Sequence, residues 1–454
     1  MSRALADAQC CYERAADTGI VSTMRSALYF LIAAKRCEIA GLHQLALTST
    51  LVHAISLLVH ALQRERGLSN LYLGSQGAQW LPAHQAQTDR SDVLQASLLL
   101  AFERLDTETS ASSGSRLFAR IAYVLQGMDA LPALRQRVVA RQCSASWATA
   151  AYIRLIAGLM AVVFEAADGA NDPDISRHLV ALFHFMQGKE FTGQERAVGA
   201  ALFAAGSTDV DAQQRLSHLI ESQERCLQVF SDFSSQSIRL LWQQIQQPDL
   251  LAGLERQRRI LLTVPSGGKL NEQLSHVWFE TCTQRLDAMK TVEDALTNEL
   301  HHLCSQRLVV AEQELADLDN LSKTPGKTPA AEPDFFEDTP LNAARLQATL
   351  LKDGPNYGPQ VERSILELVQ AQAERLQTMS DELDTVRASL HERKTIERAK
   401  GLLMAHRQLS ENEAHKAMRQ MAMNQNKRLV EVAEAVLAMA EILPAHNRST
   451  AEGT

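Results

Sequence analysis

Three stretches that contain arginine carry the side chains best suited to bind a small anion. They read QRERGLSNLYLG at 63–74, GQERAVGAALFAAG at 193–206 and LERQRRILL at 254–262. A guanidinium group presents its N–H donors in a planar fork, which matches the oxygens of a planar oxyanion. The stretches therefore indicate that oxyanion recognition is one function to consider for this chain.

Arg66 lies on the apolar face of the first stretch. With about 100° per residue, a helix places Arg66 beside Ile55, Leu58 and Leu62, whereas Arg64 points the opposite way. A buried guanidinium is costly unless it is paired and hydrogen-bonded. Its partner is either an acidic side chain from a neighbouring helix, which is the commoner arrangement, or a bound anion.

The first two stretches can be aligned with each other. The alignment places Glu65-Arg66 on Glu195-Arg196, and both stretches continue with small residues and one aromatic residue. Such a repeat predicts two pseudo-equivalent helical halves that each supply one arginine to a shared site.

Helices must position these arginines. Leu, Ala, Gln, Arg and Glu dominate the chain up to about residue 320 at helical spacing, and alternating β-branched residues are almost absent. Aromatic residues make up only 5% of the chain, so the core should be mainly aliphatic. We expect an all-α fold of long helices packed into bundles, with a helical extension at 1–44 before a sensing domain at 45–320.

Composition changes beyond this domain. The stretches 322–340 and 353–359 hold six of the twelve prolines, so residues 321–360 should form a linker. Apolar residues then recur at spacings of three and four over 361–390, the a/d pattern of a coiled coil: Leu376, Met379, Leu383, Val386 and Leu390. The alternative is an amphipathic helix packed on its own chain. Residues 391–445 should form a small three-helix bundle.

The arginine motifs, in this order within an all-α region, resemble the nitrate- and nitrite-sensing NIT domain over roughly residues 45–300. Members of that family bind nitrate between long helices through arginines. The resemblance implies that Arg66 and Arg196 bind the anion, with Arg256 as a third candidate and Arg259 nearly as plausible; which of these and Arg258 faces the ligand stays open. The third stretch could equally be a solvated basic turn of helix. We expect nitrate or nitrite as effector, no other cofactor and no metal.

The C-terminal region is basic. Residues 391–428 contain nine Lys and Arg against four acidic residues, although the whole chain has a net charge of -8. Such a separation suggests a polyanion-binding module on an acidic body, or an ordinary solvated helix surface. It also suggests that the acidic body masks the basic bundle when no ligand is bound.

The same region resembles the ANTAR domain, an RNA-binding antiterminator module, in ERKTIERAKGLLM (392–404), LSENEAHKAMRQMAM (409–423) and LVEVAEAVL (429–437). In that family a dimer binds paired hairpin loops of a leader transcript, which stops a terminator from forming. The resemblance assigns helix packing to Ala399, Ala414 and Ala422. It assigns RNA binding to five basic residues: Arg393, Lys394, Arg398, Lys400 and Arg419.

Together these features predict a nitrate- or nitrite-responsive homodimeric regulator that binds leader mRNA hairpins and prevents transcription termination. The alternative is a DNA-binding regulator whose last helices form a helix-turn-helix. No enzyme signature is visible, because the phosphate-loop-like PSGGKL (265–270) lacks the upstream glycine and carries Leu270 in place of Ser or Thr.

We expect a cytoplasmic protein without a membrane span. The start, MSRALADAQC, lacks the basic-then-apolar layout of a signal peptide, and the apolar run ALYFLIAA (27–34) is too short to cross a bilayer. The seven cysteines are scattered without zinc-binding spacing, which is typical of reduced structural thiols.

Overall fold

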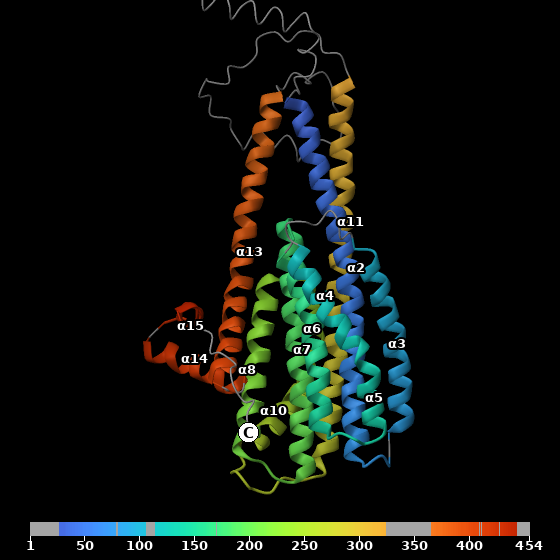
Figure 1. Ribbon diagram of the computed structural model, residues 1–454, viewed down its shortest axis with the longest axis vertical. Helices are drawn as coiled ribbons and strands as arrows, with labels where there is room; N and C mark the ends of the chain where they lie inside the picture. The colour runs from blue at the N-terminus through green and yellow to red at the C-terminus, as the bar shows by residue number, and fades with distance from the viewer. Residues whose placement is uncertain are drawn as a thin grey trace, which may run out of the picture. The chain divides into compact units, whose positions relative to one another are not determined.

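The computed structural model describes residues 27–78, 80–105, 114–168, 170–323, 365–407, 409, 411–425 and 427–442. These residues form thirteen α-helices and no strand, apart from one isolated bridge between Ser207 and Lys269 (Figure 1). The all-α prediction is confirmed. The expected linker lies outside the described residues from 324 onward.

The helices follow one another with short connections in most places. Their bounds, in chain order, are α2 (Ala27–Gly74), α3 (Leu81–Glu103), α4 (Gly114–Asp129), α5 (Leu131–Val139), α6 (Ala145–Asp168), α7 (Pro173–Ala205), α8 (Val210–Phe233), α9 (Gln236–Ile245), α10 (Pro248–Thr263), α11 (Leu274–Lys323), α13 (Ile365–Arg407), α14 (Glu411–Gln425) and α15 (Leu429–Ile442).

The chain divides into two compact units. The first comprises residues 1–44 and 305–380, and the second comprises 45–304 and 381–454. In the first unit, Glu314 of α11 accepts from Lys35 of α2 at 2.5 Å and from Arg375 of α13 at 3.3 Å. These ion pairs join the three helices that make up the described part of this unit.

The second unit is built around α7. This helix packs against α6 and α8, and α6 also packs against α4 (Figure 1). Fully buried aliphatic side chains such as Ile55, Leu62 and Val162 form much of its core, as the low aromatic content predicts. Phe203 and Trp278 belong to a further buried cluster with leucines of α7, α8 and α10.

Local sequence signals fix the ends of α7. The Asp172 side chain accepts from the amide of Ile175 at 3.0 Å, and Pro173 occupies the first turn, where its missing N–H is not needed. At the other end Gly206 has a φ of 64°, a conformation that glycine adopts without strain. Between these ends α7 is buried on nearly every face.

The C-terminal part of the second unit is the predicted small bundle. The end of α13 packs with α14 and α15 around a shared core that includes Ala399, Ala414 and Ala422, so the expected packing role of these alanines is confirmed. Helix α13 continues without interruption across residue 390, where a boundary between coil and bundle was expected.

The predicted coiled-coil seam is divided between the two units. Leu383 and Val386 are buried within the second unit, whereas Leu376, in the first unit, is half exposed. These two residues therefore follow the alternative interpretation, an amphipathic helix packed on its own chain, whereas the side chain of Leu390 lies outside what the structure describes. The dimeric coil stays a prediction.

Two helices, α2 over Leu28–Gly74 and α6, are long and apolar enough to cross a membrane by length and composition alone. About half of the most apolar window of each is buried, at 56% and 50%. Ile55 of α2 and Leu159 of α6 have no exposed surface. Packing inside a bundle is therefore sufficient to explain why these helices are apolar.

Candidate functional site

Arg66 is buried on α2, as its position on the apolar face predicts. Its Nη1 donates to Oε1 of Glu190 at 2.5 Å and its Nη2 to Oε2 at 3.3 Å. Glu190, on α7, also accepts from Nε2 of Gln63 at 2.9 Å and from Nε2 of Gln194 at 3.0 Å. For Arg66, the acidic side chain of a neighbouring helix is therefore the partner present in the structure.

Arg196 is buried on α7 in different surroundings. Its Nη1 donates to Oγ1 of Thr283 at 2.9 Å, and its guanidinium carbon lies 4.7 Å from the centre of the Phe279 ring. No carboxylate of the described residues lies within ion-pair distance of it. Burial, followed by the positive charge of Arg66, lowers the pKa of Arg196 to about 10. Arg196 thus remains charged at neutral pH in a place that favours an added anion.

The two arginines reach the same crossing of α2 and α7. A methyl group added at Gly193 of α7 would lie 2.7 Å from Nη2 of Arg66, and one added at Gly67 of α2 would lie 2.9 Å from Nη2 of Arg196. Each guanidinium therefore occupies the space that a glycine of the opposite helix leaves open. The reciprocal arrangement fits the predicted repeat, in which each half supplies one arginine.

The acidic residue that precedes each arginine is held in an equivalent way. Arg135 donates to Glu65 at 2.7 and 3.0 Å, and Arg258 donates to Glu195 at 2.6 and 2.7 Å. Both carboxylates are completely buried. Two bidentate pairs therefore anchor α2 and α7 one residue before the arginines of the crossing.

The third stretch does not place its expected residues inward. Arg256 and Arg259 are exposed, whereas Arg258 is buried. The reason is helical periodicity, because Arg258 shares the inner face of α10 with Leu254 and Leu261. Arg256 and Arg259, which the resemblance favoured, therefore do not join Arg66 and Arg196 at the buried crossing.

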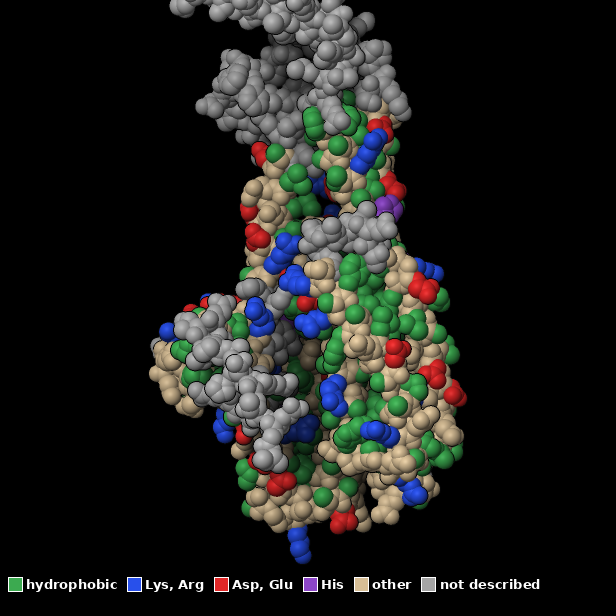
Figure 2. All heavy atoms as spheres, viewed as in Figure 1, with side chains coloured by type: hydrophobic (Ala, Val, Ile, Leu, Met, Phe, Trp, Pro, Cys, Tyr) green, Lys and Arg blue, Asp and Glu red, His purple; other side chains and the backbone are tan. Residues whose placement is uncertain are grey.

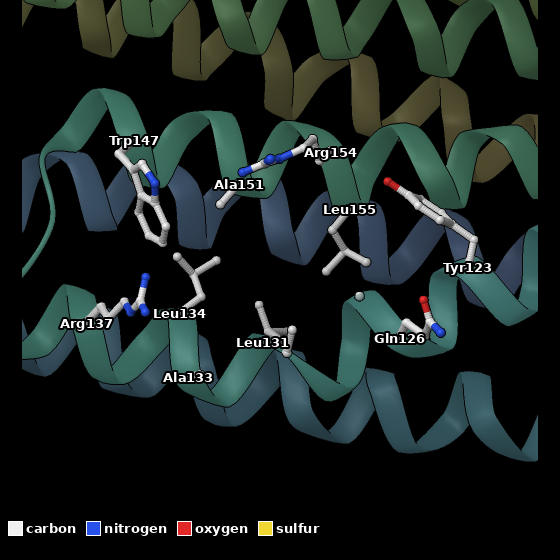
Figure 3. Close-up of a pocket in the computed structure, with 12 residues that line it drawn as sticks. Tyr123, Gln126, Leu131, Ala133, Leu134, Arg137, Trp147, Ala151, Arg154 and Leu155 are labelled. Carbon is white, nitrogen blue, oxygen red and sulfur yellow. The ribbon is translucent and has the colours of Figure 1, made fainter. Parts of the chain in front are cut away.

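A separate groove of about 480 Å³ lies on the surface of the second unit, lined from α4, α5 and α6 (Figure 3). Arg137 lies at one end with its guanidinium carbon 5.3 Å from the centre of the Trp147 ring, and Leu131 and Leu134 contribute to the lining. Figure 2 shows apolar side chains spread over the surface of the bundle. The lining is mainly apolar and Arg137 is exposed to water, so the groove suits a small anion less well than the buried crossing.

The five predicted RNA-binding residues occupy different surroundings. Arg398 and Arg419 are exposed, and Lys400 is buried. Arg393 and Lys394 lie on α13, but their side chains are outside what the structure describes. The structure therefore brings part of this set to the surface and buries Lys400.

Arg419 contacts the sensing region. It donates to Oε2 of Glu221 on α8 at 2.9 Å, and the ring of His415 lies 5.2 Å from that of His218 on the same helix. Burial, followed by the charge of Arg225, lowers the pKa of His415 to about 4. His415 is therefore neutral at pH 7 and adds no positive charge to this contact.

Comparisons with known proteins agree with these features. The NIT family model, described as nitrate and nitrite sensing, matches residues 57–301, and the ANTAR domain model matches residues 384–437. A nitrate regulatory protein of Klebsiella oxytoca is 35% identical over 406 residues, which is 89% of this chain and 93% of that protein.

A solved structure of the NasR transcription antiterminator aligns with a TM-score of 0.55 and 32% identity, covering 91% of this chain and 99% of that one. The chain therefore belongs to the NIT family of nitrate- and nitrite-sensing proteins and carries an ANTAR domain.

Proposed function

We propose that this chain is a nitrate- or nitrite-responsive regulator that binds hairpins of a leader transcript and prevents transcription termination. The order of a NIT domain followed by an ANTAR domain supports this function, as does similarity to a nitrate regulatory protein and to the NasR antiterminator. Both matched domains are regulatory modules, so we propose no enzymatic activity and no cofactor besides the anion. We propose that it acts as a homodimer in the cytoplasm.

The crossing of Arg66 and Arg196 is the observation that carries this proposal. Two guanidinium groups converge in a buried site where, within the described part of the chain, only one of them has a carboxylate partner. A planar oxyanion there could accept hydrogen bonds from both arginines and relieve their repulsion. Such binding favours one arrangement of α2 and α7 over others, which is the differential interaction that a switch requires.

We infer that the anion acts on the basic bundle through α8. Gln223 of α8 donates to Glu195 at 2.6 Å, one residue from Arg196, and Glu221 lies two residues before Gln223. Because Glu221 pairs with Arg419, a displacement of α7 can be transmitted through α8 to the proposed RNA-binding surface. Nitrate would then release Arg419 for RNA, in keeping with masking of the basic bundle by the acidic body.

Calorimetry and RNA gel shifts on the full-length chain test this function. Nitrate should bind and should increase affinity for a leader RNA hairpin but not for duplex DNA of the same sequence. Arg196→Ala should abolish nitrate binding and the increase in RNA affinity, and it leaves no carboxylate unpaired. Arg66→Lys should weaken nitrate binding, because an ammonium group cannot reproduce the planar fork of donors of a guanidinium.

Arg64→Ala is the matched control, since Arg64 is exposed on the same helix and should retain the full response. Unchanged nitrate affinity in Arg196→Ala would remove Arg196 from the site. A gel shift with duplex DNA but not with the RNA hairpin would favour the alternative function, a DNA-binding regulator with a helix-turn-helix.

A further inference from the structure

The charges at the crossing of α2 and α7 do not cancel. Arg66 and Arg196 contribute two positive charges, and Glu190 contributes one negative charge. The nearby Glu65 and Glu195 are each matched by an arginine of their own. Asp287, which also attracts Arg196, is exposed, so water screens its charge. Among the described residues, Arg66, Arg196 and the carboxylate that Arg66 binds therefore sum to one positive charge at the crossing.

Glu190 is fixed in place. Its two oxygens accept from Arg66, Gln63 and Gln194, so the carboxylate already has four hydrogen bonds. It is 3% exposed, and little water can compensate its charge if it moves. An arriving anion therefore meets Glu190 as a permanent member of the site and not as a group that it readily displaces.

We propose that Glu190 is a tethered counter-ion that sets the net charge of the anion site to +1, so that the site binds monovalent oxyanions and excludes divalent ones. This inference rests on the proposed function of the crossing as the nitrate site. A monovalent anion brings the buried cluster to neutrality. A divalent anion would leave one negative charge buried beside Glu190, which is unfavourable at low dielectric.

On the wild-type chain, anions of the same shape but different charge show whether the site selects by charge. Perchlorate and sulfate are both tetrahedral, but perchlorate carries one charge and sulfate carries two. Calorimetry at constant ionic strength should show binding of nitrate and perchlorate and at least about tenfold weaker binding of sulfate. Rejection of perchlorate along with sulfate would mean that the site selects by shape, and equal binding of sulfate and nitrate would mean that it does not select by charge; either result overturns the inference.

Glu190→Gln tests the residue itself, because it keeps the size of the side chain and removes its charge. The ratio of sulfate to nitrate affinity should rise about tenfold or more, since Arg66 is freed and the cluster becomes +2. Glu165→Gln is the matched control: Glu165 is also nearly buried, on α6, and pairs with the exposed Arg116 and Arg120. In Glu165→Gln the ratio of sulfate to nitrate affinity should stay at the wild-type value.

The outcomes separate this inference from the proposed function. If the wild-type chain does not bind nitrate, the proposed function is wrong, and the inferred selection of monovalent over divalent anions is wrong with it. If nitrate binds but Glu190→Gln, shown to be folded by circular dichroism, leaves the affinity ratio unchanged, only the role of Glu190 is overturned. If Glu190→Gln does not fold, the comparison of perchlorate with sulfate on the wild-type chain decides the inference.

Discussion

At the scale of single residues, the inward direction of Arg66 could be predicted because it lies at helical spacing from Ile55 and Leu62, and all three side chains are buried. Glu190 could not be predicted in the same way. Helix α7 is buried around most of its circumference, and Lys189, Glu190, Glu195 and Arg196 are all inside. When nearly every position is buried, periodicity cannot identify which polar residues face one another.

The glycines of the crossing lead to a prediction about ligand affinity. In Gly193→Ala the new methyl group would lie 2.7 Å from Nη2 of Arg66, the far end of a long side chain, so the guanidinium should be displaced from its place beside Glu190 while the helix stays folded. Alanine also favours a helix interior over glycine by about 0.5–1 kcal/mol. We expect an unchanged or higher midpoint of thermal unfolding and about tenfold weaker nitrate binding by calorimetry.

Gly41→Ala provides the comparison for this prediction. Gly41 lies on α2 with no neighbouring atom within 4 Å of the added methyl group, so nitrate affinity should not change. Wild-type affinity in Gly193→Ala would show that the position of Arg66 near Gly193 is unimportant for binding.

At the scale of helices, a further buried ion pair holds the crossing together. Lys189 of α7 donates to Oε2 of Glu293 on α11 at 2.8 Å, and Ser56 of α2 donates to Oε1 of the same carboxylate at 2.5 Å. Lysines 189 and 290 lower the pKa of Glu293 to about 2, against the opposing effect of burial. Helices α2, α7 and α11 thus meet at the carboxylate of Glu293. Its partner Lys189 directly precedes Glu190 on α7.

Removing one partner of this pair should be costly. Lys189→Met leaves Glu293 with only the more exposed Lys290 and the Ser56 hydroxyl, and we expect a loss of about 3–5 kcal/mol in the free energy of unfolding. Urea denaturation would measure it. The double variant Lys189→Met/Glu293→Leu should recover much of the loss, because no charge remains buried.

Lys290→Met is the control on the neighbouring helix. Lys290 pairs mainly with the half-exposed Asp294, so its removal should change the free energy of unfolding by about 1 kcal/mol or less. Equal losses of unfolding free energy in Lys189→Met and Lys290→Met would show that burial of the Lys189 pair does not increase its contribution to stability.

At the scale of the whole molecule, the sequence could predict the order of the regions because each carries local motifs: the arginine stretches and the basic C-terminal helices. It could not predict the contact between α14 and α8. Arg419 was identified as a basic residue suited to RNA, but its partner Glu221 lies almost 200 residues earlier, on a helix without any motif. Contacts between distant surface charges have no periodic signature in a sequence.

This contact gives a prediction for regulation. Glu221→Lys replaces the partner of Arg419 by a like charge, so α14 should separate from α8 and RNA affinity without nitrate should rise about tenfold in gel shifts. The added positive charge could itself attract RNA, which Glu224→Lys controls: Glu224 lies on the same helix, is exposed, and undergoes the same change of charge. A rise confined to Glu221→Lys supports release of a masked surface. An equal rise in both variants would mean that charge alone strengthens RNA binding, and the Arg419 contact would then have no regulatory role.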